Sequence, residues 1–266
     1  MDISTQEGLQ TLPLPMPDAP MLYGGGVDIS TYLSLALRPQ RNRLPPMDDD
    51  RHAFYRWILG HHIAYGAWRM LIDILQRVRR EGPTDISTVQ VATWYDRYSA
   101  AQLFAGSCTP RTYATAVRPR MAACNPSFSG LWAREYEKVV DLLPVLNAPK
   151  NSVLQQALKR HRLVHTSLAR LLVPGGESLL KDSGRRISDP VTDSERDQFD
   201  AFFMIERRPT YVGEFQYHML RRLAAAQCDL TTHPIRSDAF YKIQALLPGD
   251  LTDYLRESAI ELAELA

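Results

Sequence analysis

The chain of 266 residues has 45% hydrophobic residues and a formal net charge of +1. This length can bury a core without cross-links, and the balanced charge argues against a general attraction to nucleic acid or anionic membranes. The three cysteines form no disulfide or metal-binding pattern, and no window approaches the ~20 apolar residues of a membrane span. We therefore expect a cytoplasmic protein with neither a nucleic-acid nor a membrane partner.

The first segment, residues 1–47, is rich in proline and glycine. Proline interrupts regular helix, so we expect an extended arm with a helical turn or two near Ile29–Leu37. Its apolar residues, such as Leu12, Leu14 and Tyr23, require a surface to pack on. That surface is either the chain's own domain or a neighbouring subunit, so we expect a homo-oligomer, specifically a dimer.

Residues 48–266 are expected to form one all-α domain, because apolar residues recur every three or four positions and strand signals are nearly absent. The acidic run Asp48–Asp50 favours a helix N-terminus, and Gly82-Pro83 ends that helix. Asp85 or Ser87 is expected to cap the next one. The expected helices cover about 48–80, 85–105, 109–123, 129–146, 149–172, 193–208, 211–228, 238–247 and 250–265.

Two adjacent histidines, His61 and His62, lie inside the first of these helices. A single buried histidine is ordinarily explained by a hydrogen bond to a carbonyl or hydroxyl group. Here Tyr65 and Trp68 fall on roughly the same helical face as His62, which favours a functional site. His61 points about 100° away, and its role stays open.

A third histidine, His218, lies on a later apolar helix beside Leu220 and Leu223. Neutral imidazole is a common axial ligand of haem iron, and such leucines suit the face of a flat apolar ring. His161 and His165 have the i, i+4 spacing of a metal clamp, but basic neighbours and the lack of a nearby carboxylate favour a solvated face.

An arginine in aromatic company, Arg134, follows Phe128 and Trp132. It can form a surface salt bridge with Glu135 or Glu137. Alternatively, its planar guanidinium can bind the carboxylate of a substrate.

These three segments together resemble the tryptophan 2,3-dioxygenase family. The run His62-Ile63-Ala64-Tyr65-Gly66-Ala67-Trp68 is similar to that family's H-Q-x-Y-E-L-W helix. Residues 126–137 (PSFSGLWAREYE) are similar to its S-G-F-Q-S-x-Q-F-R-x-x-E segment, and residues 217–222 resemble the helix that carries its iron ligand. The blocks occur in the same order.

The resemblance implies an oxygenase with haem b, in which His218 binds the iron, His62 is the distal catalytic histidine and Arg134 binds the substrate carboxylate. We expect the walls of the pocket to come from Tyr65, Trp68, Phe128 and Trp132. In place of the glycine-rich segment that closes over tryptophan in the family, this chain has residues 225–234 (AAQCDLTTHP). Its Leu-Pro-Leu-Pro and Tyr-Gly-Gly-Gly runs look more like the bacterial haem-dependent L-tyrosine hydroxylases of antibiotic pathways.

The expected activity is therefore 3-hydroxylation of L-tyrosine to a catechol in secondary metabolism, with hydrogen peroxide or dioxygen as oxidant. His62 would move the proton, since an imidazole titrates near neutral pH. One alternative is a tryptophan or indole dioxygenase or monooxygenase of the same superfamily. The alternative from another class is a cofactor-free helical binding module.

Overall fold

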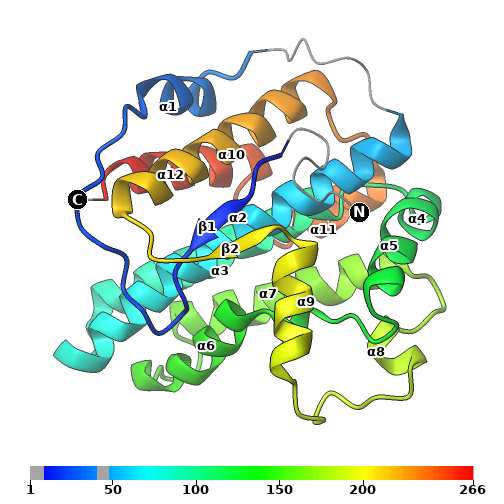
Figure 1. The fold of residues 1–266 in the computed structure, drawn as a ribbon, viewed down its shortest axis with the longest axis horizontal. Helices are drawn as coiled ribbons and strands as arrows, with labels where there is room; N and C mark the ends of the chain where they lie inside the picture. Colours follow the sequence, from blue (N-terminus) through cyan, green and yellow to red (C-terminus); the bar gives the residue numbers. More distant parts are fainter. Residues whose placement is uncertain (1–8, 41–47, 266) are drawn as a thin grey trace.

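The long helix α2 (Asp49–Glu81) runs through the middle of the molecule, and α3, α6 and α10 pack against it (Figure 1). The computed structural model describes residues 9–40 and 48–265. As predicted, acidic residues begin α2: the Asp48 side chain accepts a hydrogen bond from the Arg51 N–H. Gly82 ends the helix with a φ of 93°, a conformation that glycine adopts readily.

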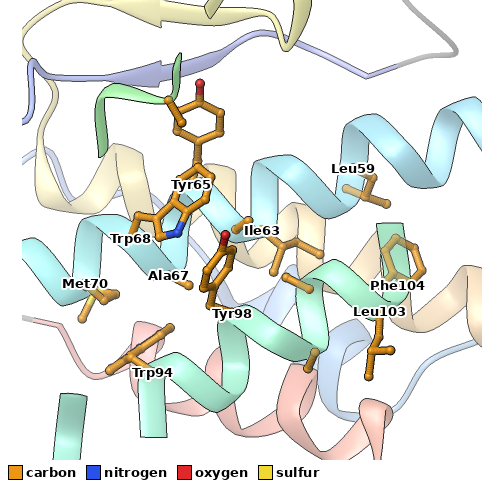
Figure 2. Close-up of a cluster of buried hydrophobic side chains, with 14 of the residues drawn as sticks. Leu59, Ile63, Tyr65, Ala67, Trp68, Met70, Trp94, Tyr98, Leu103 and Phe104 are labelled. Atoms are coloured by element: carbon orange, nitrogen blue, oxygen red, sulfur yellow. The ribbon is translucent and has the colours of Figure 1, made fainter. Parts of the chain in front are cut away.

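Helix α3 (Asp85–Ala105) packs along α2, and α7 (Val153–Leu172) packs along α3. The cap of α3 is Thr84, so the prediction of Asp85 or Ser87 as cap was wrong. Thr84 and Ser87 instead form a reciprocal capping box. Figure 2 shows Tyr65 and Trp68 of α2 above Tyr98 of α3, and the rings of Trp68 and Tyr98 are 5.0 Å apart.

Helix α10 (Val212–Thr232) packs against α2, and α1 (Ser30–Leu37) and α12 (Leu251–Ala263) pack on α10 (Figure 1). The expected helical turns near Ile29–Leu37 are thus confirmed as α1. Gly213 is required here, because a Cβ atom on it would collide with the Gly25 carbonyl group. The short helix α11 (Asp238–Gln244) precedes α12.

The two short strands β1 (Leu12–Leu14) and β2 (Ile205–Arg207) form a parallel pair. The helix predicted for 193–208 is correct only to Phe202, where α9 (Asp193–Phe202) ends. Met204 then takes a φ of 52°, and the chain turns into β2. Within the described residues, the proline-rich arm therefore packs on its own domain, with Leu12 and Leu14 fully buried.

Apart from α7, the segments between α3 and α9 form shorter pieces than expected. The predicted helix 109–123 includes a π-helical turn, a feature that frequently occurs at functional sites. The pieces are α4 (Pro110–Thr112), η2 (Tyr113–Val117), α5 (Arg118–Cys124), η3 (Gly130–Trp132), α6 (Arg134–Leu142), η4 (Leu143–Leu146) and α8 (Leu179–Asp182). Helices account for 67% of the structure and strands for 3%, which confirms an all-α single domain. Among the described residues, no helix is long and apolar enough to cross a membrane.

Candidate active site

His62 is fully buried on α2, and both of its ring nitrogens are hydrogen-bonded. Its Nε2 lies 2.6 Å from the Phe203 carbonyl oxygen, and its Nδ1 lies 2.9 Å from Nε of Arg222. Since a carbonyl only accepts and a guanidinium only donates, the ring proton is on Nε2 and the imidazole is neutral. Burial, followed by the Arg222 charge, holds the pKa of His62 well below its ordinary value.

Arg222 connects His62 to His218, one turn before it on α10. Its NH1 lies 3.3 Å from Nδ1 of His218, and its NH2 donates to the carbonyls of Gln10 and Thr11. Burial lowers the pKa of Arg222 to about 9. The structure thus brings two of the predicted site residues, His62 and His218, into contact with one buried guanidinium.

His218 is half-buried, and its Nε2 has no hydrogen-bond partner among the described residues. Burial and the neighbouring Arg222 lower the pKa of His218 to about 4. Its imidazole is therefore neutral near pH 7, which is the form that binds a metal.

Arg134 belongs to a different network, formed with aspartates of α9. It donates to Asp197 at 2.5 Å and to Asp200 at 3.3 Å, and Asp193 lies 3.7 Å away. The surface alternative, a salt bridge with Glu135 or Glu137, is not what the structure shows. Arg134 is nevertheless fully ion-paired, so any substrate carboxylate must compete with an aspartate.

Tyr65 joins this second network one helical turn after His62. Its hydroxyl donates to Asp200 at 3.0 Å, and Asp200 also receives two hydrogen bonds from Arg207. Arg207 forms a second two-point contact with Glu135, which is fully buried. Burial and the nearby Asp200 raise the pKa of Tyr65 well above its ordinary value, so it remains a hydrogen-bond donor.

Phe128 and Trp132 lie in an aromatic cluster with α9. The ring of Phe128 is stacked 5.3 Å from Phe199 and lies 5.6 Å from Trp132. Phe203, whose carbonyl binds His62, is 4.8 Å from Phe199 in the same cluster. The expected pocket walls are therefore brought together, next to the histidine pair.

His61 has an arrangement that the sequence analysis left open. Its Nδ1 lies 2.6 Å from the Trp57 carbonyl oxygen, and its ring stacks on Phe203 at 4.2 Å. Nδ1 must therefore donate, and the lone pair of Nε2 has no hydrogen-bond donor among the described residues. Trp57 Nε1, one turn earlier, is buried without a partner among the described residues. For Nε2 of His61 and Nε1 of Trp57, the only signal in the sequence is the tandem histidine itself.

Comparison with known proteins identifies the family. A family model described as "SfmD 3-methyl-L-tyrosine peroxygenase" matches residues 17–161, more than half of the chain. The chain belongs to this family. No match was found among the curated proteins.

The SfmD family consists of haem-dependent peroxygenases of the tryptophan 2,3-dioxygenase-like superfamily. They hydroxylate a tyrosine derivative with hydrogen peroxide in antibiotic biosynthesis. The predicted class of enzyme, the haem dependence and the aromatic amino acid substrate are thereby confirmed, and the cofactor-free binding module is set aside. The matched segment contains the histidine pair and Arg134, whereas His218 lies beyond it.

Of His61, His62 and His218 in this SfmD-family chain, one already has the arrangement of a haem ligand. A metal-binding histidine generally presents one nitrogen to the metal and donates its other N–H to a carbonyl or carboxylate. His61 already has this arrangement through Trp57. His218 has an unpartnered Nε2, but its Nδ1 faces the donor Arg222, so iron binding would require that contact to open. His62 would first have to release one of its two partners.

Proposed function

We propose that this SfmD-family peroxygenase hydroxylates the ring of L-tyrosine beside the phenol, giving a catechol, with haem b as its cofactor. The observation that carries the proposal is that the matched range contains both the histidine pair of α2 and Arg134, which Asp200 connects to Tyr65 on the same helix. The main competing substrate is 3-methyl-L-tyrosine, which the family description names. Tryptophan or another indole remains the alternative within the superfamily.

The iron ligand in this proposal is His218. Its support is an Nε2 with no hydrogen-bond partner among the described residues, on a half-buried ring whose pKa is lowered to about 4. This nitrogen becomes a ligand once the contact between Nδ1 and Arg222 opens and the ring proton moves to Nδ1. When bound, haem supplies the oxidation chemistry, and the protein orients the substrate and excludes water. His61 is the competing ligand, because its tautomer already exposes a nitrogen lone pair.

The substrate carboxylate is proposed to bind Arg134. Of the three aspartates around this guanidinium, Asp197 is 72% exposed and Asp200 only 7%. A substrate carboxylate would therefore displace Asp197, whereas Asp200 would stay, held by Arg207 and Tyr65. The aromatic ring would then lie against the pocket walls Tyr65, Phe128 and Trp132.

His62 is proposed to move the proton. Burial and Arg222 keep its imidazole neutral at pH 7, but they also make it a weaker base than the freely titrating imidazole expected from the sequence. Release of Arg222 would restore part of that basicity, so that His62 could accept a proton from peroxide or from the phenol and then return it. To do so it must exchange its contact with Phe203 or Arg222 for one with the substrate. His61, which has a free nitrogen, provides the matched comparison for this role.

Mass analysis of the product tests the function. We expect the haem-loaded protein with peroxide to add one oxygen atom to L-tyrosine, and a run with dioxygen and a reductant compares the oxidants. Addition to 3-methyl-L-tyrosine alone would replace the proposed substrate, and two oxygen atoms on tryptophan would favour the indole alternative.

Variants of the histidine pair test the proton transfer. His62→Ala should keep the haem spectrum and lose about 10²- to 10⁴-fold in kcat, the usual contribution of general acid–base catalysis. His61→Ala should retain kcat. The opposite pattern would transfer the role to His61.

A further inference from the structure

We propose that His52, Asp229 and His233 form a binding site for one divalent transition-metal ion. The site lies where the start of α2 meets the end of α10. It does not depend on the catalytic roles proposed above, because none of its residues takes part in them.

The three side chains converge on one point. Nε2 of His52 lies 2.6 Å and Nδ1 of His233 lies 3.3 Å from the same Asp229 oxygen, Oδ1. The three potential ligand atoms all lie within 4.8 Å of one another. Around a tetrahedral zinc ion with bonds of about 2.0–2.1 Å, neighbouring ligand atoms are roughly 3.3 Å apart. Small side-chain adjustments would therefore accommodate the ion.

Arg56 orients the Asp229 carboxylate so that one of its oxygens can bind the ion. Its Nε donates to Oδ2 of Asp229 at 2.7 Å, so the other oxygen, Oδ1, is the one presented to both histidines. Its NH2 donates to the backbone carbonyl of His233 at 2.5 Å, which fixes the end of α10. Partners that hold a ligating group from behind are typical of protein metal sites.

The charge balance predicts which ions bind. Arg56 neutralises Asp229, so the affinity must come mainly from the two imidazoles. Imidazole suits zinc, nickel, cobalt and copper, whereas magnesium and calcium prefer several oxygen ligands. The site is also open on one side, because His233 is 49% exposed while Asp229 is 6% exposed. Water can complete the coordination, and the ion would hold α2 against α10.

Titration of the full-length protein with zinc tests the proposal, after tag removal and treatment with a chelator. We expect calorimetry to give one ion per chain, with excess magnesium failing to compete, and cobalt to give visible absorption bands. The double variant His52→Ala/His233→Ala should bind at least tenfold more weakly, roughly the loss seen for groups that support metal sites. Far-UV circular dichroism verifies that it is folded.

His165→Ala is the matched control. Like His233, His165 is exposed and lies four residues from a second potential ligand, His161. The described residues place no His–carboxylate–His group around His165. This variant should bind zinc like the unmodified chain. Three results would each overturn the proposal. They are an absence of saturable zinc binding, unchanged zinc binding in the double variant, and loss of zinc binding in His165→Ala. Binding is read without haem or turnover, so failure of the proposed function leaves the result interpretable.

Discussion

Replacing Arg207 with leucine should destabilise the protein far more than a neighbouring surface replacement. Arg207 is only 16% exposed and makes two-point contacts with Glu135, which is fully buried, and with Asp200. Leucine would leave both carboxylates buried without their main cation. Removing one partner of a buried ion pair costs about 3–5 kcal/mol. Arg134 and Tyr65 still contact Asp200, so Glu135 accounts for most of the loss.

The control is Arg208→Leu, one residue further along the chain. Arg208 is 38% exposed and pairs with Glu206 and Glu214, and exposed pairs contribute about 0–1 kcal/mol. Urea unfolding at pH 7 measures both variants. A difference between the two variants below about 1 kcal/mol at pH 7 would refute the reasoning, given the ranges expected for buried and exposed pairs.

Further predictions concern the site itself. His218→Ala should lose the Soret absorption of bound haem. If His218→Ala keeps this absorption and His61→Ala loses it, His61 is the iron ligand instead. Arg134→Leu should raise KM for tyrosine with little change in kcat, and an unchanged KM would leave Arg134 a purely structural ion-pair partner. Because His62 stays neutral when folded but takes up a proton when unfolded, its contribution to the free energy of unfolding should fall by up to about 1.4 kcal/mol per pH unit below pH ~6.5. His62→Gln should flatten that slope, and an unaltered slope would contradict it. Tyr23 of the arm remains 84% exposed, so a homodimer is still expected in light scattering, and a monomeric mass would exclude it.

Local signals in the sequence sufficed for much of the helical framework. The acidic run at Asp48 and the Gly82-Pro83 stop bracket α2 because caps and breakers act within one turn of the chain. The π-helical turn at residues 113–117 lies inside a segment predicted as continuous helix. Nothing in the residue pattern of that segment distinguishes the two backbone geometries.

Contacts between distant segments could not be predicted in the same way. The end of α9 depends on β2 pairing with β1, about 190 residues earlier. The local helical pattern therefore predicted a helix that continues past the observed end of α9. The ion pairs of Arg134 also depend on a distant segment of the chain. Its neighbours Glu135 and Glu137 pair with Arg207 and Arg196, while its own partners come from α9. The two hydrogen bonds of His62 likewise come from Phe203 and Arg222, which no local pattern links to it.

The most direct test of the central claim is the absorption spectrum of the protein expressed with a haem precursor, recorded before and after addition of L-tyrosine. The account predicts a Soret band that shifts with L-tyrosine, followed by a product carrying one additional oxygen atom when peroxide is supplied. A protein that remains colourless with haem available, or a Soret band that tyrosine does not perturb and no oxygenated product, would contradict it.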